Sequence, residues 1–432
     1  MGRRVLVVSQ RFWPENFRIN DICHELTLRG LRVDVLCGQP NYPEGQFFEG
    51  YRTFGNRNDK HGDVRIYRAA EIKRDGATAL RIWLNYVSFA VSSRIKAAAL
   101  KKNRYDCVLI YQSTSLMMSP AALKIGRKQN IPVIMYAIDV WPQSFFREMD
   151  MRSPTLRKIF SVYSAKQYQG ADRIIIANEQ AEDYFTGNVH IHPGKINYIP
   201  LCPDRRLQGD GYNIALLEKY GGSFNIVFVG GVTDQNDFDG VVNVGKMIYD
   251  AGIRNIKIII VGKGNRLAQL KKKTDKARLW DIFFFEEEDR IEELPKYYNV
   301  ANALLRCPRA EIKDELAPLT ELADYMSMGK PILGVVGGQE KRIIRQTRCG
   351  YTSEPGDEQG LFDNIMRLYR AHGDDISDMG KNALKYQQKN FDREDCMDKI
   401  MEVMFRARQE DEDGFVMNRN IIKIEEDWTG EI

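Results

Sequence analysis

The residues best suited to chemistry follow apolar runs at three places in the N-terminal half. These segments are FWPENFRIND (12–21), GQPNYPEGQFFEGYR (38–52) and YAIDVWPQSFF (136–146). In the first, Asn16 stands in a favourable position to cap a helix, and the free amides of a helix start attract an anion. Arg11 and Arg18 add positive charge, and Asp139 in the third segment supplies a carboxylate. The combination predicts a site that holds an anion near a carboxylate.

The first segment lacks the features of a dinucleotide-binding loop. Such a loop needs G-x-G-x-x-G after the first strand and an acidic residue at the end of the second. This chain has SQRFWPENFR and then Leu36-Cys37-Gly38 at those places. A plain helix cap remains the alternative for Asn16 and Asp139, because both residue types are common caps. The aromatic and polar side chains of the neighbouring loops favour a functional role, since a structural turn would not require them.

The apolar runs predict parallel β-strands separated by helices. In the first half the expected strands are 5–8, 33–37, 104–111, 131–139, 171–178 and 195–200. In the second half they are 224–231, 256–264, 281–287, 301–307 and 331–336. We therefore expect an α/β protein with two Rossmann-like, doubly wound domains. Ligands of such folds bind at the carboxyl ends of the strands, so a cleft between the domains is the expected site.

The domain boundaries follow from length and composition. A chain of 432 residues is too long for one compact core, and a Pro-, Gly- and charge-rich segment lies near 201–222. We expect an N-terminal domain over 1–205 and a C-terminal domain over 206–385. A helix over 386–410 is expected to return to the N-terminal domain, and the acidic tail 411–432 is expected to pack loosely.

Composition excludes several classes of protein. The net charge of +4 argues against a nucleic-acid-coating protein. Seven scattered cysteines without a CxxC motif indicate reduced thiols and a cytoplasmic location. No group of His, Cys, Asp and Glu has zinc-site spacing, so neither a metal nor another cofactor is expected. No apolar run is long enough for a signal peptide or a membrane-spanning helix.

Together the motifs resemble one known enzyme family. FWPENFRINDI, GQPNYPEGQFFEGYR, IDVWPQSF, VGKG and DYMSMGKPILGVVGGQE are similar to segments of the retaining family-4 glycosyltransferases of the GT-B fold. The resemblance spans about residues 4–405 and points to the branch of bacterial O-antigen and capsule enzymes that includes N-acetyl-L-fucosaminyltransferases. It implies transfer of a sugar from a nucleotide-diphosphate donor, with UDP as the expected nucleotide, to an acceptor held by the N-terminal domain. No metal takes part in this fold.

The resemblance also implies roles for particular residues. Asn16 and Arg18 would help to neutralise the leaving diphosphate, and Asp139 would orient the acceptor or stabilise positive charge on the sugar. The implied donor-binding residues are Gly262, Lys263, Arg306, Thr320, Asp324, Tyr325 and Glu340. The implied acceptor-binding residues are Asn41, Tyr42 and Trp141. Glu340 could equally be a solvated loop acid.

The chain departs from the family pattern at two places in the donor motif. Thr320 and Asp324 keep the expected hydroxyl and carboxylate, but Glu321 stands where the family has a lysine. After the strand VFVGG, the segment VTDQND (232–237) has no basic residue, although the family uses Arg or Lys there to hold phosphates. The candidates to compensate are Lys263, Arg266, Arg306 and Arg309, among which the sequence does not choose.

A basic segment suggests contact with a membrane surface. Residues 79–104, ALRIWLNYVSFAVSSRIKAAALKKNR, have apolar residues at helical spacing with basic residues between them. Such a helix can lie on an anionic bilayer, with Trp83, Tyr86 and Phe89 as interfacial anchors, or can pack its apolar stripe on the sheet. The polyprenyl-diphosphate-linked saccharide acceptor that the resemblance implies would bring the protein to the cytoplasmic face of the inner membrane as a peripheral protein.

Two other functions remain open at this point. A nucleotide-sugar epimerase shares the same architecture but needs no acceptor loop or basic helix. A catalytically degenerate partner subunit would bind a sugar nucleotide or another transferase without turnover. The missing basic residue in 232–237 keeps this last alternative open beside the leading hypothesis of a retaining glycosyltransferase.

Overall fold

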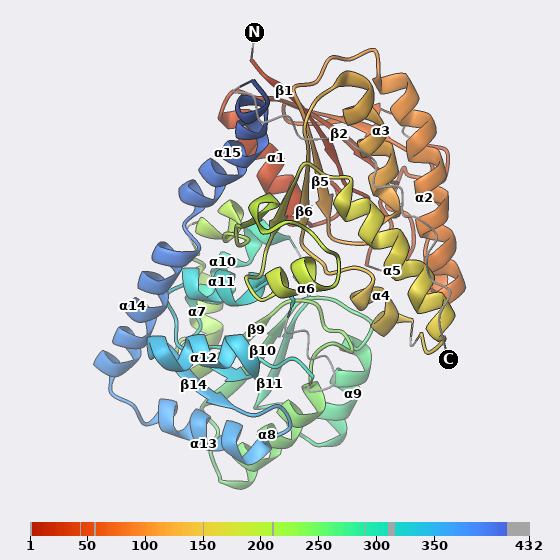
Figure 1. The fold of residues 1–432 in the computed structure, drawn as a ribbon. Coiled ribbons are helices and arrows are strands. Elements are labelled where there is room, and N and C mark those ends of the chain that lie inside the picture. Colours follow the sequence, from red (N-terminus) through yellow and green to blue (C-terminus); the bar gives the residue numbers. More distant parts are fainter. Residues whose placement is uncertain are drawn as a thin grey trace, which may run out of the picture.

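The computed structural model describes residues 2–43, 45–55, 58–149, 151–209, 211–288, 290–309 and 316–412. Its chain forms two α/β units, one above the other in Figure 1, each with a central sheet and helices on both faces. The expected fold class, α/β with two Rossmann-like, doubly wound domains, is confirmed. Most of the expected acidic tail, from residue 413 onward, lies outside the described residues.

The N-terminal sheet has eight strands in the described part of the chain, in the order β3-β4-β2-β1-β5-β6-β7-β8. They are β1 (Arg4–Val8), β2 (Arg32–Cys37), β3 (Asn58–His61), β4 (Val64–Arg68), β5 (Cys107–Gln112), β6 (Val133–Ala137), β7 (Arg173–Ile176) and β8 (Ile196–Tyr198). Central β1 pairs in parallel with β2 and β5, placing Val5 beside Val33 and Cys107. Only β3 and β4 pair antiparallel in this sheet as described, and the sequence did not predict either of them.

Helices cover both faces of this sheet. The helices before the domain boundary are α1 (Arg18–Leu28), α2 (Ala79–Leu100), α3 (Ser119–Gln129), α4 (Gln143–Glu148), α5 (Pro154–Gln169) and α6 (Ala181–Gly187). Side chains of α2, α3 and α5 pack in one apolar core, and those of α1 pack in a second core on the opposite face. The short 3-10 turns of the chain are η1 (Asp75–Ala77), η2 (Leu116–Met118), η3 (Pro193–Lys195), η4 (Arg205–Gln208) and η5 (Ile291–Glu293).

The C-terminal sheet has six strands among the described residues, in the order β11-β10-β9-β12-β13-β14, and all pairs are parallel. They are β9 (Phe224–Val229), β10 (Ile256–Val261), β11 (Phe283–Glu286), β12 (Ala303–Arg306), β13 (Ile332–Val335) and β14 (Gly350–Ser353). The helices are α7 (Ile214–Tyr220), α8 (Phe238–Asp250), α9 (Leu267–Lys276), α10 (Pro295–Asn299), α11 (Thr320–Ser327), α12 (Gly338–Thr347), α13 (Glu358–Tyr369) and α14 (Gly373–Asn390).

The last helix, α15 (Arg393–Glu412), leaves the C-terminal unit and packs on the N-terminal one, as Figure 1 shows. Its side chains Cys396, Met397 and Ile400 are buried in the core that also holds α1. The guanidinium of Arg393 donates hydrogen bonds to Asp21 of α1 at 2.5 and 2.9 Å. This buried ion pair and the apolar contacts together hold α15 on the N-terminal sheet.

One expectation for α2 is wrong. Tyr86 and Phe89 point into the core beneath the helix, and the ring of Trp83 packs against Phe145 and Phe160. Tyr86 and Phe89 are therefore buried and not available as interfacial anchors, whereas Trp83 is half-buried against the core. Among the described residues, no helix combines the length and apolar character that crossing a membrane requires.

Candidate functional site

The two units meet through an arginine at the start of α1. Nη2 of Arg18 donates to both carboxylate oxygens of Asp324 on α11, at 2.8 and 2.7 Å. Nη1 of Arg18 lies 3.5 Å from Asp204, in the segment that links the units. The three side chains are 8%, 17% and 2% exposed, respectively. The contact joins the first residue of α1 to α11, the helix that the sequence assigned to donor binding.

The carboxyl group of Asp324 is a weaker acid in this contact than an ordinary Asp. Burial raises the pKa of its carboxyl group to about 6, and the charge and hydrogen bond of Arg18 offset only part of this effect. Asp204 also donates a backbone hydrogen bond to Asp324, at 3.3 Å. The carboxylate that the family motif assigns to the nucleotide ribose is therefore already bound by groups of the N-terminal unit and the linker.

We expect Asp324 to titrate near pH 6 in the folded protein, compared with about 3.9 for an ordinary Asp. Between these values the folded state binds a proton that the unfolded state does not, so the contribution of this group to stability falls as pH rises. NMR of 13C-carboxyl-labelled Asp checks the value, with Asp324→Asn to assign the signal. In Arg18→Gln the pKa should rise further, because a neighbouring cation is lost. An Asp324 pKa at the ordinary value would contradict this prediction.

A second arginine lies at the carboxyl end of β12. Nη1 of Arg306 is 2.6 Å from Glu321 on α11, and its Nε donates to Glu340 on α12 at 3.2 Å. Burial disfavours the charged form, but the two carboxylates still hold the pKa of this guanidinium above its ordinary value. Glu321 and Asp324 are three residues apart and so lie on one face of α11. Arg306 and Arg18 thus approach the same face of this helix from opposite units.

Two glycine-containing loops adjoin this edge of the C-terminal sheet. Gly262 and Gly264 follow β10 with φ of 141° and 158°, and a Cβ on them would lie 2.0 Å from the carbonyl oxygen of Gly230 and 2.2 Å from that of Val232. Glycine is required at both positions because the backbones approach so closely. Lys263, between them, has an exposed side chain. Thr320, the first residue of α11, is half-buried.

The segment without a basic residue, 232–237, has arginines from elsewhere beside it. Arg309 donates from Nε to the carbonyl oxygen of Asn236 at 3.2 Å, and its Nη2 lies 3.6 Å from Asp239. Arg266 is 3.1 Å from Asp234. Each of these cations is thus paired with an acid of the loop or of α8. Of the candidates to compensate, Arg306 contacts Glu321 on α11, the helix that Arg18 also reaches.

Asp139 follows β6 on the N-terminal side of the site. Its carboxylate accepts a hydrogen bond from the hydroxyl of Ser144 on α4, at 2.6 Å, and the residue is half-buried. The structure does not place Asp139 as the cap of α4, because Pro142 holds that position. Its side chain is therefore oriented by the first turn of α4 and remains partly accessible.

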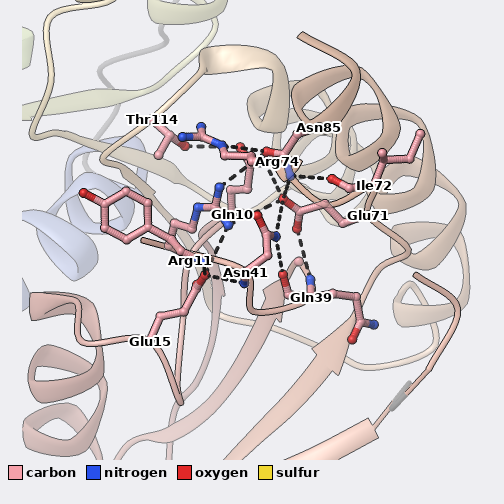
Figure 2. Close-up of polar contacts among 12 residues, drawn as sticks. Gln10, Arg11, Glu15, Gln39, Asn41, Glu71, Ile72, Arg74, Asn85 and Thr114 are labelled. Atoms are coloured by element: carbon pink, nitrogen blue, oxygen red, sulfur yellow. Dashed lines mark hydrogen bonds and ion pairs between the residues drawn. The ribbon is translucent and has the colours of Figure 1, made fainter. Parts of the chain in front are cut away.

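A buried polar cluster underlies the loops that follow β1, β2 and β4 (Figure 2). Oε1 of Glu15 accepts from the backbone N–H groups of Asn41 and Tyr42, both at 2.8 Å, and from Nη1 of Arg11 at 3.2 Å. Glu71 accepts from Asn85 of α2 at 2.6 Å. These bonds tie the loops to each other and to α2, because buried polar groups are costly when left unpaired.

Four sequence-based expectations are corrected here. Asn16 is exposed and is not the N-cap of α1, since Phe17 holds that position. Arg11 is buried with Glu15 and adds no charge to an open site. Trp141 is buried in the apolar core against Phe145 and Phe160, and Tyr325 is buried with its hydroxyl bonded to the backbone of Val229. Both rings are structural in this conformation.

The two other residues expected to bind the acceptor, Asn41 and Tyr42, differ in exposure. Asn41 is fully buried and belongs to the polar cluster, whereas the side chain of Tyr42 is exposed beside the loop. Sequence reasoning missed Asp204, which it treated as part of a linker, and Glu15, Glu71 and Asn85, which join the loops. Nothing in the sequence singles out these residues, because their partners lie far away along the chain. No group of His, Cys, Asp or Glu side chains within the described ranges is arranged to hold a metal ion.

Comparison with known families assigns both units. The model described as "Glycosyl transferase 4-like domain" matches residues 16–202, and the model described as "Glycosyl transferases group 1" matches residues 214–386. The chain belongs to the group 1, 4-like glycosyltransferases. Among curated protein sequences, none matches this glycosyltransferase.

Solved structures share the fold over nearly the whole chain. A sucrose-phosphate synthase from Thermosynechococcus elongatus is 14% identical, with a TM-score of 0.69, 93% of this chain covered and 98% of that one. WaaG, a glycosyltransferase involved in lipopolysaccharide biosynthesis, is 13% identical, with a TM-score of 0.66 and coverage of 93% and 99%. HepE of Anabaena in complex with UDP is 12% identical, with a TM-score of 0.63 and coverage of 93% and 98%. The expected GT-B fold is confirmed.

Proposed function

We propose that this glycosyltransferase is a retaining, metal-independent enzyme that transfers a hexosyl or N-acetylhexosaminyl group from a UDP-sugar to a polyprenyl-diphosphate-linked saccharide. It would act in the synthesis of surface polysaccharide, such as O-antigen or capsule, at the cytoplasmic face of the inner membrane. The observation that carries the proposal is the convergence of Arg18 and Arg306 on one face of α11. HepE, solved with UDP and with UDP-glucose, and WaaG, named for lipopolysaccharide biosynthesis, support the donor and the pathway by their likeness.

Arg306 is the cation best placed to hold the donor diphosphate. The family motif has a lysine on the helix where this chain has Glu321, and Arg306 lies 2.6 Å from that carboxylate. This chain therefore carries a positive charge at the end of β12, on Arg306, where the family carries one on the helix that corresponds to α11. The amides at the start of α11 add a partial positive charge beside it. Together these groups would neutralise the leaving diphosphate, so the reaction needs no divalent cation.

In the proposed chemical step, the acceptor hydroxyl attacks the anomeric carbon of the donor sugar. It attacks on the same face from which the diphosphate departs. The acceptor hydroxyl oxygen forms a bond to the anomeric carbon as the bond from that carbon to the diphosphate oxygen breaks. The departing phosphate oxygen takes the hydroxyl proton. Because the new bond forms on the face from which the leaving group departs, the anomeric configuration is retained. Asp139, held by Ser144, would orient the acceptor and stabilise positive charge on the sugar.

Arg18 and Asp324 would exchange partners when the donor binds. The donor ribose would hydrogen-bond to Asp324, while Arg18 would turn toward the diphosphate. Lys263, Thr320, Glu340 and the backbone at Gly262 remain the proposed donor contacts beside Arg306, and Tyr42 and exposed Asn16 remain proposed contacts on the N-terminal side. The pairing of Arg18 with Asp324 thus keeps two buried charges satisfied while the site holds no donor.

A partner subunit without turnover is the second candidate. The absence of a basic residue in 232–237 and the acidic Glu321 favour it, because both weaken the ordinary phosphate site. A nucleotide-sugar epimerase is a less favoured alternative. Epimerisation needs no acceptor, so it would give the residues around Asp139 no role. Donor binding and turnover separate these candidates.

The test of the proposed function is calorimetry with UDP and UDP-sugars in EDTA, followed by an assay of donor hydrolysis. We expect binding without metal, slow release of sugar, and a decrease of about 100-fold in turnover in Asp139→Asn, the size of a lost electrostatic contact in a transition state. The UDP dissociation constant should stay unchanged in that variant. Asp378→Asn, on exposed α14, is the matched control. A folded protein that binds no nucleotide would favour the partner-subunit function instead.

A further inference from the structure

Helix α2 is apolar on two opposite sides. Its inward side chains, buried against the sheet, are Ile82, Tyr86, Phe89, Ala97 and Leu100. A second apolar row consists of Leu80, Leu84, Val87, Val91 and Ile95, at positions i, i+4, i+7, i+11 and i+15. In a helix of about 3.6 residues per turn this spacing places the row on one side. Leu80, Val91 and Ile95 in this row are exposed, so packing within the protein does not account for them.

Helix α5 lies beside α2 and continues the apolar surface. The ring of Trp83 on α2 meets that of Phe160 on α5 at 5.6 Å, and Figure 1 shows the two helices along the same side of the N-terminal unit. Leu156, Ile159 and Val162 of α5 are exposed. Six of the thirteen large apolar side chains that are exposed in the described part of the chain therefore belong to these two helices. We call this surface the α2–α5 face.

The charged residues of α2, α5 and the neighbouring α3 are all basic. The sequences of α2, α3 and α5 contain no Asp or Glu. The basic residues of these helices and of the turn after α2 are Arg81, Arg94, Lys96, Lys101, Lys102, Lys124, Arg127, Lys128, Arg157, Lys158 and Lys166. A contact with Lys128 lowers the pKa of Lys101, as expected where ammonium groups crowd together. An anionic partner would relieve this repulsion.

We propose that the α2–α5 face docks on an anionic lipid bilayer, with its aliphatic side chains in the interface and its basic residues against the headgroups. The proposal rests on the proposed function and names the surface through which the enzyme meets its lipid-carried acceptor. The side chains that enter the lipid are Leu80, Val91, Ile95, Leu156, Ile159 and Val162. They differ from the aromatic residues that the sequence suggested.

A bilayer fits this face better than other partners do. A nucleic acid would use the basic residues but would leave the exposed aliphatic row in water. A second copy across a two-fold axis would bring one basic face against another, because such an interface joins the same patch of both subunits. Aliphatic side chains surrounded by Lys and Arg are the pattern of helices that lie in the interface of an anionic membrane.

The position of the face also suits the reaction. α2 follows the carboxyl-end loop of β4, and α5 follows the short helix α4, which comes after the loop of β6 that carries Asp139. Both helices therefore start beside the edge of the sheet where the candidate site lies. Asn85, on the inward side of α2, donates to Glu71 at 2.6 Å and to the carbonyl oxygen of Ile72 at 2.7 Å. A docked α2 would thus be hydrogen-bonded to the loop that follows β4.

Co-sedimentation with lipid vesicles tests the proposal. Wild-type protein should partition onto phosphatidylglycerol-containing vesicles and not onto pure phosphatidylcholine. In Ile95→Glu/Ile159→Glu the partition coefficient should fall at least about tenfold, because two carboxylates replace aliphatic contacts at an anionic surface. Arg94→Gln/Lys101→Gln/Lys102→Gln should lower it similarly and reduce its dependence on salt. Ile214→Glu on α7 is the matched control, since Ile214 is 60% exposed and Ile95 70%.

The outcomes separate this proposal from the proposed function. UDP binding measured by calorimetry should be equal in the wild type and in Ile95→Glu/Ile159→Glu, which also confirms that the variant is folded. Loss of vesicle binding with intact UDP binding supports the α2–α5 face, whatever the enzyme transfers. The proposal would be overturned if wild-type protein did not bind phosphatidylglycerol-containing vesicles, or if Ile95→Glu/Ile159→Glu bound them as well as the wild type does. A stable dimer in light scattering that Ile95→Glu dissociates would also overturn it in favour of self-association.

Discussion

Arg18→Leu is expected to lower the free energy of unfolding by about 3 kcal/mol, the cost of breaking a buried ion pair and leaving its partner unpaired. Asp324 would lose this cation, whereas Asp204 would keep Arg206 at 2.9 Å, and neither carboxylate is more than 17% exposed. The melting temperature of the ligand-free protein should fall by several degrees. Differential scanning calorimetry at pH 7.5, where Asp324 is ionised, measures the change.

The double variant Arg18→Leu/Asp324→Leu isolates the cause. Replacing a buried ion pair by apolar side chains of similar volume is often neutral for stability. The double variant should therefore recover most of the loss in melting temperature, but it should bind UDP poorly because both groups are proposed to meet the donor. If Arg18→Leu alone melts at the wild-type temperature, the contact between the units contributes nothing and the proposed exchange of partners fails.

Arg306→Leu is expected to weaken UDP binding by about 100-fold, roughly 3 kcal/mol, which is the upper range for a charge-assisted hydrogen bond to a buried ligand. The loss follows if this guanidinium replaces the lysine that the family carries on α11. Calorimetry with UDP and with uridine separates the diphosphate contact from the nucleoside, because uridine binding should hardly change. The sugar nucleotide should show the same loss as UDP.

A charge relocation provides the sharper test of the same idea. In Arg306→Leu/Glu321→Lys the cation returns to the helix position that the family uses, and we expect at least about tenfold of the lost UDP affinity to return. Glu321→Lys alone places two cations together and should not destroy binding. Arg370→Leu, an exposed arginine at the end of α13, is the matched control. A larger loss in Arg309→Leu than in Arg306→Leu would place the diphosphate beside 232–237 instead.

The strands that the sequence predicted are those with apolar, β-branched runs, such as Val5–Val8 and Ile256–Val261. Such runs are buried on both faces of a parallel sheet, so their composition alone identifies them. β3 was missed because Asn-Asp-Lys-His is a polar hairpin strand at the sheet edge. β4 was missed although Val64 and Ile66 alternate with polar residues, and β14 is a short polar strand at the other sheet's edge.

The candidate site was only partly predictable, for a different reason. The position of Asp139 after an apolar strand is a local feature, and the structure places this residue at the carboxyl end of β6. The pairing of Arg18 with Asp324 joins residues 306 positions apart, and composition carries no trace of it. The burial of Trp141 and Tyr325 depends likewise on the elements that surround them. Residue type indicated which groups could react, but tertiary packing decided which of them are exposed.

The return of α15 to the N-terminal sheet means that the chain crosses between the two units twice. Near residue 200 it passes downward, and between α14 and α15 it passes back. A fragment that ends at the first crossing would lack the helix whose Met397 and Ile400 cover the core around α1. The N-terminal unit is therefore discontinuous in sequence, and isolating it for study requires a circular permutant or co-expression of α15 as a separate peptide. The C-terminal unit, in contrast, is a single continuous insertion within it.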